Sequence, residues 1–425
     1  MLKEYPEYKE TEAEWYGKIP KEWKTEKIKY LFSERIDKNH PNEPCLVSSQ
    51  HMGVVPKTVY GQRTVEVMKD LHLLKLVEIG DFVISLRSFQ GGLEYAYYRG
   101  IISPAYTILK NNGKISSEYF KYLAKSSNFI DLLKTCVTGI REGQNIDYSV
   151  LKNQFLPIPP IDEQNAIVKY LDYKTKQIDE FVSAKEKEIE SLQELKKSLV
   201  ADAVTKGISG EELVDSGIEW LPKVPKGWTV HTLRHLLKAF SEKNHSEMQL
   251  LSVTRELGVI VRDVEDTESN HNFIPDDLSN YKMVKKGQFV INKMKAWQGS
   301  YGVSDFDGIV SPAYFIFDLD FENKEFFHLA IRSRKYADFF ARYSDGIRIG
   351  QWDLSMLDMK NIPFFVPPIE EQEKIIKYCK DKVRNIDTLI TSIQKQVTLV
   401  KELRTKLIAD AVTGNIDVRD VEIPA

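Results

Sequence analysis

Residues 158–164 read IPPIDEQ, and residues 366–372 read VPPIEEQ. The stretches 162–206 and 370–413 that follow contain neither proline nor glycine, and each ends just before a glycine. Proline before, acids in the first turn and glycine just beyond the end are signals for the start and stop of a helix. At 1.5 Å per residue, about 44 residues make a helix of roughly 65 Å. The sequence therefore predicts two long helices of matched length.

Apolar residues recur in both stretches at steps of three and four, the spacing of a coiled-coil seam, with Lys185 interrupting the first stripe. So narrow a stripe cannot be buried on a lone helix in water. We therefore expect the two helices to pack on each other in antiparallel orientation; the alternative is that each helix packs on its own globule. The predicted seam residues are Ile178, Val182, Ile189, Leu192, Leu195 and Leu199 in the first helix and Ile386, Ile390, Ile393, Val397, Val400, Leu403 and Leu407 in the second.

The two helix-start motifs belong to a duplication that runs through the chain. Four more pairs of segments match in the same order, at an offset that drifts by about three residues. So long a period indicates one domain plus one connector, present twice. The pairs are EWYGKIPKEW (14–23) with EWLPKVPKGW (219–228), GIISPAY (100–106) with GIVSPAY (308–314), TGIREGQ (138–144) with DGIRIGQ (345–351), and LVADAVT (199–205) with LIADAVT (407–413).

The segments before each long helix carry short apolar runs rich in β-branched and aromatic residues, such as DFVISL at 81–86 and QFVIN at 288–292. Helical patches follow at 117–135 and 323–343. We predict an α+β fold in which two similar strand-rich globules are separated by two long antiparallel coiled-coil helices, as a pseudo-twofold internal repeat. The expected boundaries are 1–160 for the first globule, 161–209 for the central helix, 210–368 for the second globule and 369–425 for the C-terminal helix.

Composition restricts the partners and the compartment. The 425 residues carry a formal net charge of −3, so a surface for a polyanion must gather its positive charge locally. Cys45, Cys136 and Cys379 are scattered and form no CxxC pair, which argues against a disulfide framework or a zinc site. The N-terminus is polar, and no apolar run approaches the roughly 18 residues of a membrane span, so we expect a cytoplasmic protein.

The sequence shows no catalytic signature. The patterns GxxxxGK[ST], GxGxxG after a strand, HExxH and GxSxG are missing, and there is no NPPY-like adenine-methylation motif. We therefore expect a protein that binds and positions but catalyses nothing by itself, with no metal and no cofactor of its own.

The duplicated motifs resemble a known family. EWLPKVPKGW, GIVSPAY, GIRIGQ followed by VPPIEEQ, and the terminal LIADAVTGNIDVR are similar to the specificity subunit of type I restriction–modification systems, over nearly the whole chain and in both halves. The first copy departs from this pattern at its end, where LVADAVTKGISG stands in place of AVTGNIDV.

The resemblance implies two target-recognition domains, each reading one half of a split double-stranded DNA site, and helices that set the spacing and hold two modification (methyltransferase) subunits. Partner subunits would bring S-adenosylmethionine and methyl transfer, and restriction subunits would bring ATP, magnesium, translocation and cleavage. Half-sites one helical turn apart lie about 34 Å from centre to centre, which suits a bipartite protein with a rigid spacer. The alternatives are a bipartite protein-binding adaptor or decoy without DNA contact, and a self-contained methyltransferase or nuclease, which the missing motifs disfavour.

Two shared loops are candidates for DNA contact. RSFQG at 87–91 and KAWQG at 295–299 each follow a predicted strand. The basic residue suits phosphate or guanine, the glutamine suits N6 and N7 of adenine, and the aromatic ring suits a base or sugar. The alternative for Phe89 and Trp297 is core packing.

The GIREGQ and GIRIGQ segments raise the same question. Arg141 and Arg348 stand beside glycines that allow close backbone approach, either as phosphate contacts or as braces for the helix start. Segments that both halves share suit a scaffold or phosphate clamp, whereas divergent segments, such as 57–72 and 261–280, are where different sequences would be read. The predicted DNA-contacting residues are Gln62, Arg63, Arg87, Ser88, Phe89, Gln90, Arg141, Gln144, Arg255, Lys293, Lys295, Trp297, Gln298, Arg348 and Gln351.

Overall fold

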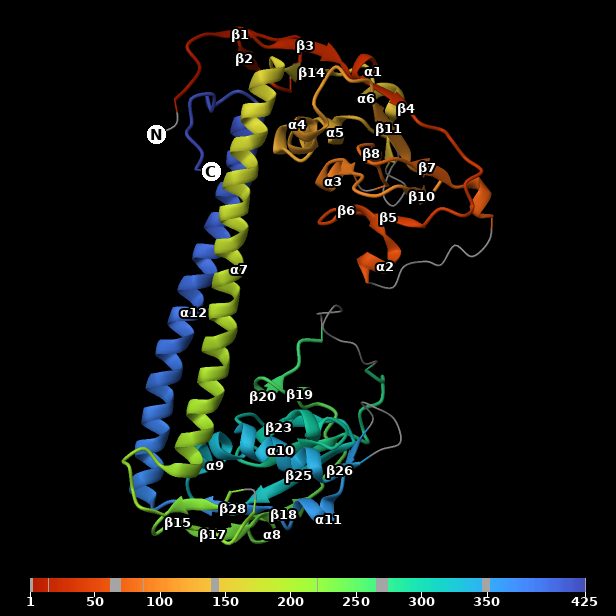
Figure 1. The fold of residues 1–425 in the computed structure, drawn as a ribbon. Helices are drawn as coiled ribbons and strands as arrows, with labels where there is room; N and C mark the ends of the chain where they lie inside the picture. The colour runs from red at the N-terminus through yellow and green to blue at the C-terminus, as the bar shows by residue number, and fades with distance from the viewer. Residues whose placement is uncertain are drawn as a thin grey trace. The chain divides into compact units, whose positions relative to one another are not determined.

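The computed structural model describes residues 3–13, 15–61, 70–86, 88–138, 145–219, 221–264, 274–345 and 352–424. Its contacts divide the chain into two compact units. Unit 1 consists of Met1–Lys185 with Gln394–Ala425, and unit 2 consists of Glu186–Ile393. Each unit contains one globule and part of both long helices, α7 (Ile161–Lys206) and α12 (Ile369–Val412) (Figure 1). The boundary between the units thus runs through both long helices, whereas the predicted domains treat each helix as one undivided segment.

The elements of the two globules follow one another in nearly the same order. In unit 1 they are β1 (Tyr8–Glu10), β2 (Lys18–Pro20), β3 (Lys24–Lys27), α1 (Ile28–Leu31), β4 (Phe32–Glu34), β5 (Leu46–Ser49), β6 (Gly53–Pro56), α2 (Lys57–Tyr60), η1 (Leu71–Leu73), β7 (Lys75–Val77), β8 (Phe82–Ile84), α3 (Ser88–Gly91), β9 (Glu94–Tyr95), β10 (Gly100–Ile102), β11 (Thr107–Asn111), α4 (Ser117–Leu123), α5 (Ser127–Thr135), β12 (Val137–Thr138), β13 (Asn145–Ile146), α6 (Tyr148–Leu151) and β14 (Phe155–Ile158). In unit 2 they are β15 (Leu213–Asp215), β16 (Lys223–Pro225), β17 (Thr229–Thr232), α8 (Leu233–Leu236), β18 (Leu237–Phe240), β19 (Leu251–Thr254), β20 (Gly258–Val261), β21 (Lys282–Val284), β22 (Phe289–Asn292), η3 (Ala296–Gln298), β23 (Tyr301–Val303), β24 (Gly308–Val310), β25 (Tyr314–Leu319), α9 (Lys324–Ile331), α10 (Arg334–Arg342), β26 (Ser344–Asp345), β27 (Asp353–Leu354), α11 (Met356–Met359) and β28 (Pro363–Val366).

Each globule is built on an antiparallel four-stranded sheet, β4–β11–β8–β9 in unit 1 and β18–β25–β22–β23 in unit 2. Successive side chains of a strand point to opposite faces of its sheet. On β8, Phe82 and Ile84 enter the main core of unit 1, and Val83 enters a smaller core on the other face. Strand β22 repeats this arrangement in unit 2. Both faces of the central strands are therefore buried, as their continuous apolar runs predict.

The shared PPIxEQ motif forms the start of each long helix. The side-chain amide of Gln164 donates to the carbonyl oxygen of Pro159 at 2.8 Å, and Gln372 donates to Pro367 at the same distance. The preceding residue, a glutamate, accepts a hydrogen bond from an indole: Trp23 to Glu163 in unit 1 and Trp228 to Glu371 in unit 2. These motifs are duplicated because each globule fastens a helix start in the same way.

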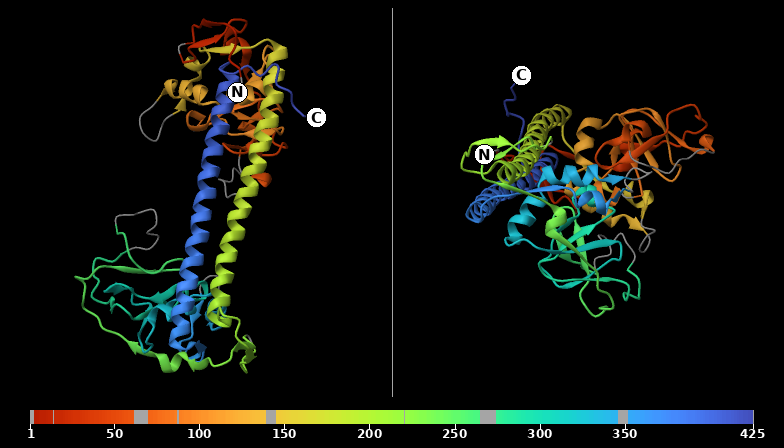
Figure 2. Two further views of the ribbon diagram at one scale, coloured as in Figure 1. Left: turned by 90° about the vertical axis from the view of Figure 1, so that its left-hand side faces the viewer. Right: turned by 90° about the horizontal axis from the view of Figure 1, so that it is seen from below.

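Within each unit, a segment of α7 runs beside a segment of α12 (Figures 1 and 2). An ion pair joins them in each unit, between Asp179 and Arg404 at 3.1 Å in unit 1 and between Lys196 and Asp387 at 2.7 Å in unit 2. Asp179 precedes Lys196 along α7, whereas its partner Arg404 follows Asp387 along α12. The two helices are therefore antiparallel. The four residues occupy equivalent positions of the two sequence repeats.

Most of the predicted seam residues are buried or partly buried, whereas two of them are exposed. Leu195 is 53% exposed and Leu403 is 55% exposed, so neither lies in the seam. Both positions are predicted from two successive steps of three residues along the helix. Six residues fall about a third of a turn short of two full helical turns, so these side chains point away from the seam. Strict alternation of three and four instead runs through Lys185, Lys196 and Arg404, which are partly buried. The buried or partly buried seam residues are Ile178, Val182, Ile189, Leu192, Leu199, Ile386, Ile390, Ile393, Val397, Val400 and Leu407.

The C-terminal end of each long helix completes the core of a globule. Ile408, Ala411 and Val412 of α12 belong to the main core of unit 1, and the carbonyl oxygen of Val412 accepts a hydrogen bond from Tyr119 at 2.9 Å. At the end of α7, Ala203 and other residues enter the core of unit 2. Apart from the aspartate, the residues of the duplicated ADAVT segments are therefore buried.

Candidate nucleic-acid interface

In unit 1 three segments gather beside the RSFQG motif. Its residues 88–91 form α3, which packs on α5 and on β13, the strand that follows the GIREGQ segment. The turn between β5 and β6 lies next to the same motif, because a side chain at Gly91 would meet the Gln50 side chain at 2.9 Å. The ammonium of Lys125 bridges the two segments, donating to the carbonyl oxygens of Gly91 at 2.9 Å and Gln50 at 3.4 Å.

Unit 2 repeats this gathering with different side chains. The KAWQG motif forms η3, which packs on β27, the strand that follows the GIRIGQ segment. The rings of Trp297 and Trp352 lie 5.0 Å apart, and Lys293 pairs with Asp353 at 3.0 Å. In both globules, the strand that follows the GIRxGQ segment thus packs on the RSFQG or KAWQG motif, although the two are distant in sequence.

The described candidates divide into surface and interior residues. Gln90, Lys295 and Gln298 are exposed, and Arg255 is 65% exposed. Ser88 is buried and its hydroxyl accepts a hydrogen bond from the backbone N–H of Ser85, so this residue supports the turn from inside and does not reach the surface.

The two aromatic candidates are intermediate. Phe89 packs against the main core of unit 1, as the alternative interpretation has it, while retaining partial exposure. Trp297 is partly exposed, and its indole nitrogen has no hydrogen-bond partner among the described residues. The remaining candidates, Gln62, Arg63, Arg87, Arg141, Gln144, Arg348 and Gln351, lie outside the described residues.

The sequence reasoning missed Lys125 and Arg332. They occupy equivalent places in the repeats, each directly before the serine that precedes α5 or α10. It also missed the pair SQHMGVV (49–55) and TRELGVI (254–260), which form the two β-hairpins β5–β6 and β19–β20. The signal was weak because only a Ser/Thr, a glycine and two aliphatic positions recur.

Arg332 and His328 lie next to each other, close to Gly258 of the β19–β20 hairpin. Nδ1 of His328 accepts a hydrogen bond from the backbone N–H of Val303 at 3.1 Å. Burial, and next the charge of Arg332, lower the pKa of His328. Burial also lowers the pKa of Arg332, although nearby Tyr301 and Glu256 oppose this effect. The imidazole is therefore held neutral as a hydrogen-bond acceptor beside a guanidinium.

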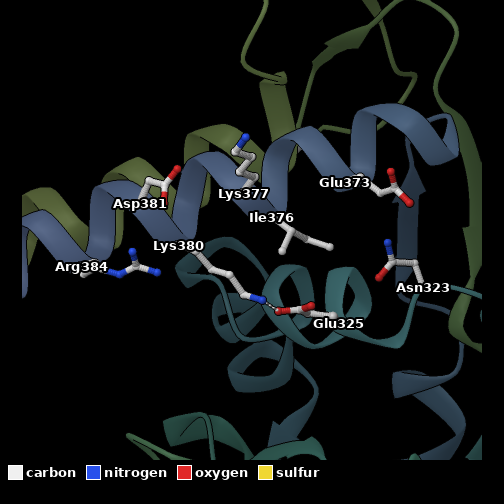
Figure 3. A pocket seen from close by; sticks show the side chains of 8 residues that line it. All are labelled: Asn323, Glu325, Glu373, Ile376, Lys377, Lys380, Asp381 and Arg384. Atoms are coloured by element: carbon white, nitrogen blue, oxygen red, sulfur yellow. Dashed lines mark ion pairs between the residues drawn. The ribbon is translucent and has the colours of Figure 1, made fainter.

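A hollow of about 480 Å³ lies in unit 2 where α9 meets α12. Figure 3 shows Lys380 of α12 reaching Glu325 of α9, with which it forms an ion pair. Acidic and basic side chains balance around the hollow, so it is not a site for one sign of charge. Its lining residues are Asn323, Glu325, Glu373, Ile376, Lys377, Lys380, Asp381 and Arg384. At the position equivalent to Lys380 in unit 1, Asp172 accepts a hydrogen bond from Tyr122, so both globules are fastened to their helix here.

No cluster of three or more histidine, cysteine, aspartate or glutamate side chains suited to a metal occurs within the described ranges. Among the helices that the structure describes, none has the length and apolar character needed to cross a membrane.

Comparison with known proteins shows which proteins the chain resembles. Residues 74–191 match the model of the type I restriction modification DNA specificity domain, which covers β7 to the first part of α7. The chain is also similar along its length to two specificity subunits of Methanocaldococcus jannaschii. It is 23% identical over 366 residues to that of type I restriction enzyme MjaVIII, covering 81% of each chain, and 22% identical over 443 residues to that of MjaIX, covering 98% of each.

Residues 74–191 thus match a type I restriction modification DNA specificity domain, and the chain as a whole is similar to specificity subunits of type I restriction enzymes. A solved structure from work on complex assembly and conformational transition of the type I R-M system has the same fold, with a TM-score of 0.63 and 12% identity, covering 93% of this chain and 98% of that one.

Proposed function

We propose that this chain is the non-catalytic subunit that recognises DNA sequence in a type I restriction–modification complex, with each globule reading one half of a bipartite site. The observation that supports the proposal is that each globule brings a duplicated loop motif, the strand after its GIRxGQ segment and one hairpin into one place, while the exposed side chains of the hairpin turns differ. A shared frame with different side chains suits the reading of two different half-sites.

The proposed contacts follow from side-chain chemistry. Lys295 suits a phosphate, and Gln90 and Gln298, which are exposed, suit the N6 and N7 edge of adenine. Arg255 suits the O6 and N7 edge of guanine. With a net charge of −3 on the chain, such local cations must supply the attraction to phosphate.

We further propose that the helices set the spacing of the half-sites and dock two methyltransferase subunits. Exposed apolar residues flank each interhelical ion pair: Phe181 and Leu403 in unit 1, and Leu195 and Leu389 in unit 2. Phe181 is the repeat equivalent of Leu389, and Leu195 that of Leu403. Two equivalent surfaces suit two copies of one partner. In this proposal the partners supply S-adenosylmethionine, ATP and magnesium, and this chain supplies none of them.

Methylation-aware sequencing of DNA from cells that carry the complete system tests the proposal. The expected result is methylation at one bipartite motif that disappears when this chain is deleted. Methylation that persists unchanged without the chain would contradict the proposal. A gel-shift assay with purified methyltransferase subunit tests the adaptor alternative, which requires a stable protein complex that does not retain DNA sequence-specifically.

A further inference from the structure

One cation in unit 2 holds three backbone carbonyls of the candidate interface. Arg332 follows directly after α9, and its guanidinium is partly buried. It donates to the carbonyl oxygens of Arg255 and Glu256, both at 2.8 Å, and to that of Tyr301, which lies just beyond the KAWQG motif. The turn between β19 and β20 is thus tied to the segment that follows this motif.

Lys125 plays the equivalent part in unit 1. Besides the carbonyls of Gln50 and Gly91, its ammonium contacts the carboxylate of Glu94 at 2.6 Å, and Glu94 is only 2% exposed. The turn between β5 and β6 is thus tied to the last residue of the RSFQG motif. Lysine and arginine differ in geometry, yet each joins the hairpin turn of its globule to the equivalent region, which is the end of the RSFQG motif in unit 1 and the segment just after KAWQG in unit 2.

The two turns share an internal frame as well. Each opens with a hydroxyl that accepts a backbone N–H three residues on: Ser49 from Met52 at 3.4 Å, and Thr254 from Leu257 at 3.1 Å. Each closes with a glycine in the left-handed region, at φ +72° for Gly53 and φ +75° for its counterpart in β20. A side chain at Gly53 would also lie 2.7 Å from a backbone oxygen, so the frame requires glycine there.

Between these fixed ends the three intervening side chains are exposed in both turns. They read Gln-His-Met at 50–52 and Arg-Glu-Leu at 255–257. Lys125 or Arg332 binds backbone carbonyls of these turns and so fixes the position of the backbone. The exposed side chains therefore project into solvent from a backbone of defined position. An equal frame with different exposed residues is what two readers of different sequences require.

We infer that the turns 49–53 and 254–258 are specificity-determining segments, and that Lys125 and Arg332 are positioning residues that hold them for reading. The inference rests on the proposed function and adds its recognition elements. The ligand is the major-groove edge of duplex DNA. Gln50 suits adenine, Arg255 suits guanine, and the carboxylate of Glu256 suits the N4 amino group of cytosine.

The test uses the full chain in its complex, acting on a plasmid library in which the bases of both half-sites are randomised. Arg332→Met should relax base preference by on the order of tenfold at one or two positions of a single half-site, since one lost base contact has about that effect. Arg332→Lys, which keeps a donor in place, should restore part of the preference. Lys125→Met combined with Glu94→Gln, so that no buried carboxylate is left unpaired, should relax the other half-site only.

Two controls separate positioning from loss of folding. The thiol of Cys379 in unit 2 is 1% exposed, so slow labelling by a thiol reagent shows that this unit remains folded. If Arg332→Met opens the unit, Arg255→Gln with Glu256→Gln replaces it as the test. These side chains are exposed, so the double variant leaves the fold intact while altering preference in the same half-site.

Relaxation confined to one half-site, in opposite halves for the two units, supports the inference. An unchanged preference in folded Arg332→Met, or in Arg255→Gln with Glu256→Gln, would overturn it while the proposed function stands. A wild-type complex that methylates no bipartite motif would overturn the proposed function, and the inference with it.

Discussion

At the scale of single residues, the glutamates that begin the long helices show how the repeat is fastened. Glu163 is 5% exposed and accepts hydrogen bonds from the indole of Trp23 at 2.8 Å and from the hydroxyl of Tyr5. A buried carboxylate that loses a donor pays the cost of its lost hydration. The short motif PPIxEQ therefore begins the helix through its glutamine and joins it to a distant part of the globule through its glutamate.

Trp23→Phe should lower the free energy of unfolding of unit 1 by about 2–4 kcal/mol, because it removes one donor to a buried charge and leaves a cavity. Denaturant-dependent thiol labelling measures this effect, with buried Cys136 reporting unit 1 and buried Cys379 reporting unit 2. Trp228→Phe is the matched control and should accelerate labelling of Cys379 instead. Equal acceleration at both cysteines in either variant would contradict the assignment.

The neutral state of His328 gives unit 2 a pH dependence. Its folded pKa is lowered from the usual 6.5, so the unfolded chain takes up this proton at a higher pH than the folded one. The stability linked to this group is present above about pH 6.5 and is lost as pH falls below it. His328→Asn keeps an acceptor for the N–H of Val303 but cannot titrate, so it should flatten the decline in melting temperature between pH 7 and pH 5. A decline as steep as that of the wild type would exclude this histidine as its source.

At the scale of elements, the helix pair separates residues that stabilise it from residues that face outward. Ile390 is 9% exposed, whereas its neighbour Leu389 is 53% exposed. Ile390→Ala should lower the free energy of unfolding of unit 2 by about 2–3 kcal/mol, and Leu389→Ala should change it by less than about 0.5 kcal/mol. Labelling of Cys379 measures both.

The same two variants test the docking proposal in opposite directions. Leu389→Ala should weaken binding of the methyltransferase subunit in a pull-down or calorimetric titration, because it removes exposed apolar area from the proposed surface. Ile390→Ala, in protein that remains folded, should bind nearly as wild type. Loss of binding in the second variant alone would refute the proposed surface.

The sequence predicts these elements well and their facing residues less well. The predicted helices 162–206 and 370–413 correspond to α7 and α12 within one residue at each end, because proline, acid and glycine signals are local. Leu195 and Leu403 fall in the predicted seam because apolar character alone cannot show which of two adjacent rows of side chains faces the partner helix. The basic residues Lys196 and Arg404 occupy that row, with their apolar stems in the interface and their charges on aspartates.

The candidate site was predictable only where chemistry is visible in a motif. The RSFQG and KAWQG loops stand out because they are duplicated, and the structure brings each next to the strand that follows its GIRxGQ segment. Lys125 and Arg332 act through backbone carbonyls, which have no sequence signature, so only the fold reveals them.

At the scale of the whole molecule, unit 1 depends on the last residues of the chain. The hydroxyl of Tyr8 donates to the carbonyl oxygen of Gly414 at 3.1 Å, and the N–H of Asp417 donates to the carbonyl of Lys3 at 2.8 Å. Val418 is 2% exposed in the main core of this unit. The two ends of the sequence therefore meet in one unit.

Deletion of residues 414–425 should destabilise unit 1 by about 2–4 kcal/mol, because it removes one fully buried aliphatic side chain and several hydrogen bonds. Labelling of Cys136 should accelerate, while labelling of Cys379 should keep its wild-type rate. Acceleration at Cys379 alone would show that the tail supports unit 2 instead.

During synthesis, this arrangement imposes an order. Unit 2 is one continuous stretch of the chain, whereas the core of unit 1 also needs Ile408, Ala411 and Val412 of α12, which are made last. A chain that lacks these residues would leave the core of unit 1 open and accessible to proteases.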